Sequence, residues 1–140
     1  MLEEEEKKER KLPFNESFIH FTFEFKLMLP RDSRLQNEKD IERVYRKGKS
    51  FKEDFLVLKA VKNSLAKSRF AFIVSQKVSK KAVARNKVKR RLRETIKKQI
   101  KAMAPGFDNL VIARSETSEK NFPEIEKVLI KLLKRAKLIK

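Results

Sequence analysis

The spacing of apolar residues predicts a helix near the start of the regular part of the chain. Asn37 is a typical N-cap residue, and Gly48 is typical of the position just after a helix. Between them, Ile41, Val44 and Tyr45 recur at helical intervals, which places them on one side of the helix. The pattern therefore predicts an amphipathic helix between these two ends.

Two apolar stretches further along are typical of strands. Residues 51–62 form the first, with a polar break at residues 52–54, and residues 69–75 form the second. The polar residues Asn63 and Ser64 lie between them and indicate a loop. We therefore expect the two strands to pair as a hairpin.

The second half of the chain predicts two helices around a short strand. Ser79 is a candidate cap for a long helix that ends before Pro105, and residues 109–114 predict the strand. Asn121, followed by Pro123, opens a last helix whose apolar residues follow a 3.6-residue spacing. The order helix, strands, helix, strand, helix predicts an α+β fold, a small mixed sheet packed with helices.

Residues 1–27 differ in kind from the rest of the chain. They hold five Lys or Arg and seven Asp or Glu residues, a net charge of −2, whereas residues 28–140 hold 32 and 12, a net charge of +20. The stretch Phe21–Leu27 alternates like a half-buried strand. We expect the working domain to begin at Met28 and the preceding residues to be disordered or not native. The alternative is a genuine extension whose phenylalanines add a strand or cover a cleft.

The net charge narrows the class of partner. The chain carries 37 Lys and Arg against 19 Asp and Glu, a formal net charge of +18, and its pI is about 10.3. A compact chain this basic repels itself strongly unless a polyanion neutralises it. Nucleic acid is the first candidate and an anionic membrane surface the second. The membrane alternative fails because the bulky Trp and Phe face of an interfacial helix is lacking.

Several residue types that catalysis needs are scarce. The chain has no cysteine, one histidine (His20) and two glycines. These counts exclude thiolate zinc sites, His-based metal sites and glycine-rich phosphate loops. No apolar run approaches the roughly 20 residues of a spanning helix, and the acidic N-terminus is unlike a signal peptide. We therefore expect a cytoplasmic protein that has no membrane partner and holds no metal or other cofactor.

The acidic clusters have a simple structural interpretation. They comprise Glu38, Asp40 and Glu42 in the first helix, and Glu124 and Glu126 in the last. Acids in the first turn of a helix favour its N-terminus. We therefore expect no catalytic residue on this chain.

The most informative segment is the basic helix predicted after Ser79. Its buried stripe falls on every fourth residue, namely Val88, Leu92, Ile96 and Ile100. A row of cations follows about 100° further round, namely Arg85, Lys89, Arg93 and Lys97. Like charges four residues apart cost stability unless something neutralises them, and RNA phosphates can do so. The candidate RNA-binding residues are Arg85, Asn86, Lys89, Arg90 and Arg93. The alternative is an ordinary solvated face.

The residues around this helix resemble a known signature. Residues 74–93 read VSQKVSKKAVARNKVKRRLR. This run resembles the bacterial ribonuclease P protein component, in which a strand ending in V-S-x-K-V leads through a short connection to a helix with R-N-x-x-K-R-x-x-R. Arg34-Leu35, the strand Phe55–Leu58, Ile112–Arg114 and the last helix fall in the family's order. The resemblance covers about residues 28–140.

The resemblance implies a fold, a partner and a role. The fold is a ribosomal-protein-like sandwich with an unusual left-handed β-α-β crossover. The partner is a large catalytic RNA that removes the 5′ leader from precursor tRNA, using magnesium ions held by the RNA. The protein helps bind the leader and supports the active RNA, and it has no small-molecule substrate. The alternative is a structural RNA-binding protein of the ribosomal type.

The resemblance also implies a leader-binding cleft on the sheet face away from the bulky core. If the two predicted strands pair as a hairpin, Leu56, Leu58 and Ile73 share that face. The full set of predicted cleft residues is Ile41, Tyr45, Leu56, Leu58, Ile73 and Phe122. Ile41 and Leu58 stand where other family members can carry aromatic residues, so base stacking would contribute less. The alternative for these residues is plain core packing.

Overall fold

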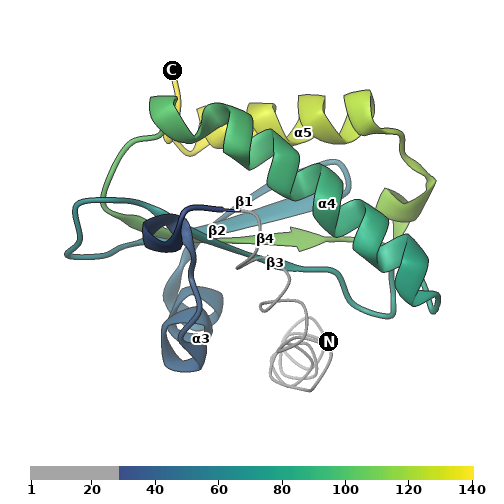
Figure 1. Cartoon of the computed structure of the whole chain (residues 1–140), viewed down its shortest axis with the longest axis horizontal. Helices are drawn as coiled ribbons and strands as arrows, with labels where there is room; N and C mark the ends of the chain where they lie inside the picture. The colour runs from purple at the N-terminus through teal and green to yellow at the C-terminus, as the bar shows by residue number, and fades with distance from the viewer. Residues whose placement is uncertain (1–28) are drawn as a thin grey trace.

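The structure, a computed structural model, describes residues 29–140 (Figure 1). The predictions for the preceding residues, including the strand Phe21–Leu27 and the domain start at Met28, lie outside the described residues. Within 29–140, helices and strands follow in the predicted order. The elements are η2 (Arg31–Ser33), α3 (Glu38–Lys47), β1 (Lys49–Glu53), β2 (Leu56–Lys62), β3 (Arg69–Ile73), α4 (Ala82–Gln99), η3 (Ile100–Ala102), β4 (Phe107–Ala113), η4 (Ser115–Glu119) and α5 (Phe122–Arg135).

Local sequence explains where the helices begin. The side chain of Asn37 accepts a hydrogen bond from the backbone N–H of Lys39 and caps α3 as predicted. At α5, the side chain of Asn121 accepts from the N–H of Glu124, whose carboxylate accepts from the N–H of Asn121 in return. This reciprocal pair is a capping box. The helix predicted after Ser79 forms as α4, but Ser79 is not its cap: Lys81 occupies the N-cap position, and the Ser79 hydroxyl accepts a hydrogen bond from the N–H of Lys81 instead.

Gly48 follows α3 for a different reason from the predicted one. Its backbone is extended, with a φ of −65°, and not left-handed. A Cβ atom at this position would lie 2.4 Å from the carbonyl oxygen of Val44 and 3.2 Å from the backbone nitrogen of Ala60. Glycine is therefore needed because the end of α3 and the backbone of β2 approach each other closely.

The order of strands corrects the predicted pairing. The sheet runs β1-β2-β4-β3, with β3 and β4 parallel and the other neighbours antiparallel. The hairpin between β2 and β3 is wrong, because β4 lies between them and α4 makes the β-α-β connection from β3 to β4. The polar loop after β2 is tied to the segment before β4, since the N–H of Asn63 donates to the carbonyl of Gly106 at 2.8 Å. The loop was identified correctly, but distant residues decided the pairing.

Helices cover both faces of the sheet. In Figure 1, α4 and α5 lie above the sheet and α3 lies below it. The carboxylate of Glu53 on β1 pairs with Lys131 and Arg135 of α5, so Glu53 projects from the face under α5. Leu56 lies directly opposite Glu53 and therefore projects from the same face. This face holds the main apolar core, whose fully buried strand residues are Leu56, Leu58, Phe70, Phe72 and Val111. Leu110 is also fully buried but projects to the α3 side.

The register also corrects the predicted division of faces. Directly paired residues of neighbouring strands project from the same face. Leu58 lies opposite Val111, which lies opposite Phe72. Leu56 and Leu58 therefore share the core face with the phenylalanines, whereas Ile73 projects to the α3 side. The prediction was wrong on this point because it assumed a hairpin that does not form.

Candidate RNA-binding surfaces

Three of the predicted RNA-binding residues of α4 reach the surface. Arg90 is exposed, and Arg85 and Asn86 are half-buried. The guanidinium of Arg85 donates from Nη1 to the carbonyls of Ser79 at 2.9 Å and Lys80 at 3.0 Å, so it folds back on the segment before the helix. Arg90 and Asn86 are therefore the members of the predicted set best placed to contact a partner.

Lys89 and Arg93 depart from the prediction of an open row of cations. Their side chains are only 4% and 8% exposed, and both interact with other groups of the protein. The apolar stripe of a surface helix is about 100° wide. Lys89 and Arg93 neighbour Leu92 around the helix, so they lie at the margin of this stripe, where the rest of the protein can bury them. A buried cation loses hydration and needs compensating partners. Lys89 and Arg93 are therefore held within the protein, and their assignment to the RNA-binding set stays a prediction.

Other cations of α4 face α5. Nη1 of Arg91 donates to the carbonyl of Lys120 at 2.8 Å, and Nζ of Lys98 pairs with Glu126 at 3.1 Å. These contacts secure α4 against α5 and the segment before it. The outward surface of α4 is thus narrower than its sequence suggests. The exposed cations of the helix are Lys87, Arg90, Lys97 and Lys98, of which Lys98 is paired with Glu126.

A second candidate surface is the sheet face beside α3. We call it the α3-side face and define it by its half-exposed residues Val57, Lys59, Val61 and Ile112. Paired positions of β2 and β4 place all four on one face. Aliphatic side chains form most of this surface, and Lys59 adds a cation among them. This combination can accept both the bases and a phosphate of a single strand.

Tyr45 connects α3 to this face. Its side chain is 5% exposed. The ammonium of Lys59 lies 4.3 Å from the centre of the Tyr45 ring and donates to the carbonyl of Tyr45 at 2.9 Å. The ring is thus already covered by a cation, which leaves less of it for base stacking. Ile41 is fully buried and packs in the core, so it is not the rim residue that was predicted.

Phe122 is not brought to the α3-side face. Its ring lies 5.0 Å from Nζ of Lys98 on α4, in the layer on the opposite side of the sheet (Figure 1). Leu56 and Leu58 also project to that side. Of the predicted cleft residues, the structure therefore places Tyr45 and Ile73 on the α3 side, with Ile41 packed behind them. Sequence reasoning missed the four residues that define this face, because alternation shows two faces without showing which one stays open.

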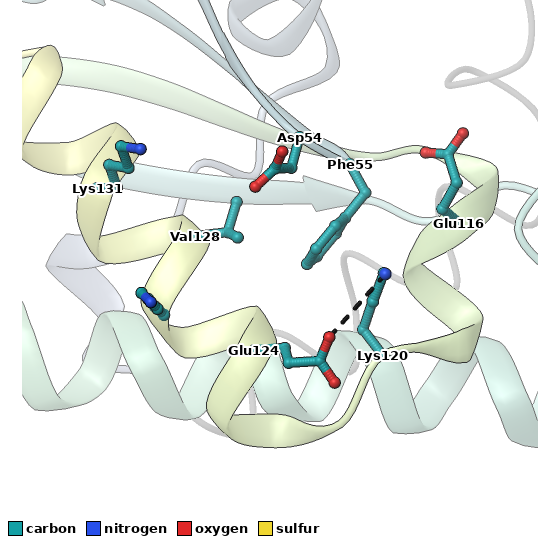
Figure 2. A pocket seen from close by; sticks show the side chains of 8 residues that line it. Asp54, Phe55, Glu116, Lys120, Glu124, Val128 and Lys131 are labelled. Atoms are coloured by element: carbon teal, nitrogen blue, oxygen red, sulfur yellow. Dashed lines mark ion pairs between the residues drawn. The ribbon is translucent and has the colours of Figure 1, made fainter.

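A hollow lies between the β1–β2 turn and α5 (Figure 2). Its volume is about 550 Å³, and Phe55 and Val128 form its apolar part. The Lys120 ammonium and the Glu124 carboxylate face each other there at 4.0 Å. The charged residues of its wall are Asp54, Glu116, Glu124, Lys120, Lys127 and Lys131. Because acids and lysines are balanced, the hollow has little net attraction for phosphate.

The acidic clusters form ion pairs. Asp40 pairs with Arg69 at 3.4 Å, and Glu42 pairs with Arg46 at 2.6 Å within α3. In the described part of the chain, no three His, Asp or Glu side chains are arranged to hold a metal ion. Among the helices of residues 29–140, none combines the length and the apolar character needed to cross a membrane.

Comparison with known proteins gives one consistent result. The family model for ribonuclease P matches residues 29–137. A ribonuclease P protein component from Clostridium botulinum (strain 657 / Type Ba4) is 39% identical over 107 residues, which are 76% of this chain and 96% of that protein. The 2.0 Å structure of the Staphylococcus aureus RNase P protein superposes with a TM-score of 0.72 at 31% identity, covering 77% of this chain and 98% of that one. The RNase P protein from Thermotoga maritima gives a TM-score of 0.67 at 34% identity, with 73% and 96% coverage.

Proposed function

Because the chain belongs to the ribonuclease P protein family, and is thus a subunit of a ribonucleoprotein endoribonuclease, we propose that two of its surfaces bind two different RNA segments. The exposed side of α4 contacts the catalytic RNA. The α3-side face holds the single-stranded 5′ leader of precursor tRNA. The observation that carries this proposal is that the two surfaces lie on opposite sides of one sheet. In Figure 1, α4 lies above the sheet and α3 lies below it. A sheet between them keeps the two RNA segments at a fixed separation.

The chemistry of α4 suits a structured RNA. Arg90 offers a planar fork of donors that matches phosphate oxygens. Asn86, one turn earlier, offers a donor and an acceptor for a base edge or a 2′-hydroxyl. Both side chains stand on a helix that Arg91 and Lys98 secure, through their contacts with Lys120 and Glu126. The α4 surface is therefore rigid, which favours recognition of RNA shape.

The chemistry of the α3-side face suits a flexible single strand. Its aliphatic residues can pack against any base, and Lys59 can contact a phosphate. The four half-exposed residues that define it include no aromatic ring, and aromatic stacking is the strongest source of base contact in such sites. We therefore expect this face to bind leaders with little preference for nucleotide sequence.

The catalytic groups belong to the RNA. The protein contributes a cationic surface between two polyanions, which lowers their mutual repulsion. Magnesium ions held by the RNA supply the Lewis-acid chemistry of cleavage. We expect the complex to work in a reducing compartment, the cytoplasm, as the cysteine-free composition of the chain suggests.

A reconstitution assay tests the proposal. A bacterial ribonuclease P RNA is incubated with precursor tRNA over a series of magnesium concentrations, with and without the protein. We expect the protein to lower the magnesium concentration needed for leader removal and to cleave nothing by itself. An unchanged magnesium requirement would favour a structural RNA-binding protein, and cleavage by RNA-free protein would place catalytic groups on this chain.

A further inference from the structure

A buried carboxylate lies at the centre of an ion-pair cluster on the α3 side of the sheet. The side chain of Asp108 on β4 is 0% exposed. It accepts hydrogen bonds from Nη2 of Arg43 at 2.9 Å, from Nε and Nη2 of Arg69 at 2.8 and 2.7 Å, and from Nδ2 of Asn63 at 2.8 Å. One carboxylate thus joins α3, β3, β4 and the loop after β2.

The cluster holds α3 from two directions. Arg43 lies in the middle of α3 and binds Asp108 directly, whereas Arg69 also pairs with Asp40 in the first turn of α3 at 3.4 Å. The hydrogen bond and charge of Asp108 raise the pKa of Arg69, with a further contribution from Asp40. Arg43 therefore makes the direct connection between α3 and the buried carboxylate.

Orientation, more than stability, is what such a cluster supplies. Burying a charge costs hydration free energy, which can offset the attraction within a buried ion pair, so such a pair adds little net stability to a fold. The apolar contacts of Ile41 and Val44 resist separation of α3 from the sheet, but they allow rotation, because hydrophobic contact has no direction. Charge-assisted hydrogen bonds do have a direction. The bond of Arg43 therefore restricts rotation of α3 about its own axis.

Rotation of α3 would alter the α3-side face. Arg43 and Tyr45 are two residues apart, hence about 200° apart around the helix, on opposite flanks of it. Tyr45 is the residue that meets Lys59 at the edge of that face. A turn of α3 that pulls Arg43 away from Asp108 therefore moves Tyr45 relative to Lys59.

We propose that Arg43 is a positioning residue for leader binding. Through its bond to Asp108 it fixes the rotation of α3 and so keeps Tyr45 in contact with Lys59. This inference rests on the proposed function, because it assumes that the α3-side face binds the leader. Arg43 itself touches no RNA in this scheme. Its replacement should change the discrimination between precursor and mature tRNA and should leave binding of the catalytic RNA unchanged.

The variants are chosen to separate positioning from charge and from folding. Arg43→Met keeps an apolar stem and removes the donor, whereas Asp108 retains Arg69 and Asn63. Arg43→Lys restores a cation. Because Arg43 binds Asp108 through a single nitrogen, the ammonium of a lysine can take the place of the guanidinium. Arg46→Met is the matched control, because Arg46 lies on the same helix and, within residues 29–140, pairs with Glu42 one turn away on α3.

The measurement is the dissociation constant of precursor and of mature tRNA from the complete protein–RNA complex, with the melting temperature of the free protein alongside. We expect Arg43→Met to reduce the precursor-to-mature affinity ratio about three- to tenfold, Arg43→Lys to recover most of it, and Arg46→Met to leave it unchanged. An unchanged ratio in Arg43→Met, or an equal loss in Arg46→Met, would overturn the inference. If the unaltered protein shows no preference for precursor tRNA, the proposed function itself has failed.

Discussion

The two candidate RNA surfaces are assembled in different ways. The α4 surface comes from one continuous segment, in which spacing alone places Arg90 and Asn86 on the same side of a helix. The α3-side face is collected from β2 and β4, which are far apart in sequence, and Tyr45 of α3 meets it at Lys59. The first kind of surface can be identified from a short motif, whereas the second depends on which strands pair. The comparison teaches that a motif locates a candidate binding helix, but does not show which residues of that helix are exposed to a partner.

The largest effect should separate the two kinds of cation on α4. Arg93 is 8% exposed and Arg90 is exposed. Arg93→Ala should lower the free energy of unfolding by about 1–3 kcal/mol, because it removes a buried group and its contacts, whereas Arg90→Ala should leave it nearly unchanged. Urea unfolding of both variants checks this difference. Equal stabilities would mean that Arg93 is as free as the sequence alone suggested.

The same pair should behave differently toward RNA. Arg90→Ala should flatten the slope of log K against log salt by nearly one unit on the catalytic RNA, as expected for one lost phosphate contact. Affinity measured at several salt concentrations gives the slope, and Lys97→Ala tests whether the effect extends along the helix. A slope that stays the same in Arg90→Ala would remove this side of α4 from the interface.

The next effect should distinguish the two aromatic residues predicted for the cleft. Tyr45→Leu should reduce the preference for precursor over mature tRNA about two- to fivefold, because it removes the ring that holds the Lys59 ammonium at the edge of the α3-side face. Phe122→Leu should not, because Phe122 lies in the opposite layer, against Lys98. Binding of both tRNAs to the complete complex measures the preference. A similar loss in Phe122→Leu would show that the leader passes along the α5 side instead.

A smaller effect concerns the contact between β1 and α5. The pKa of Glu53 is lowered from its ordinary value of 4.5, chiefly by its hydrogen bond with Lys131 and then by Arg135. Since the folded pKa lies below the unfolded one, the stabilisation is present above pH 4.5 and is lost as the pH falls through the folded pKa. Glu53→Gln should therefore melt at a lower temperature than the unaltered protein at pH 7 and at nearly the same temperature at low pH. A difference that persists in acid would mean that the charge of Glu53 is not its source.

The smallest effect is expected for the first 27 residues. We propose that the working domain starts at Met28, in agreement with a family match that begins at residue 29. A protein that starts at Met28 should melt, bind RNA and support leader removal like the full chain. Loss of folding or activity on truncation would make the phenylalanine-rich stretch Phe21–Leu27 part of the working protein.

Much of the fold could be predicted because its determinants are local. The caps Asn37 and Asn121, the apolar spacing of α5 and the basic helix α4 each depend on residues a few positions apart. The candidate site was predicted less completely. Lys89 and Arg93 have the same local signature as Arg90, and only packing shows that they are buried.

The sequence by itself determined the class of this protein: its elements, their order, its cationic character and the basic helix that is the candidate RNA-binding segment. All of these follow from composition and from periodicity within single helices and strands. Only the tertiary structure decided that β4 separates β2 from β3, and hence that Val57 and Lys59, not Leu56 and Leu58, share a face with Ile73. The physical reason is that a strand alternates between two faces, and its neighbours in the sheet, not its own residues, determine which face is covered by helices.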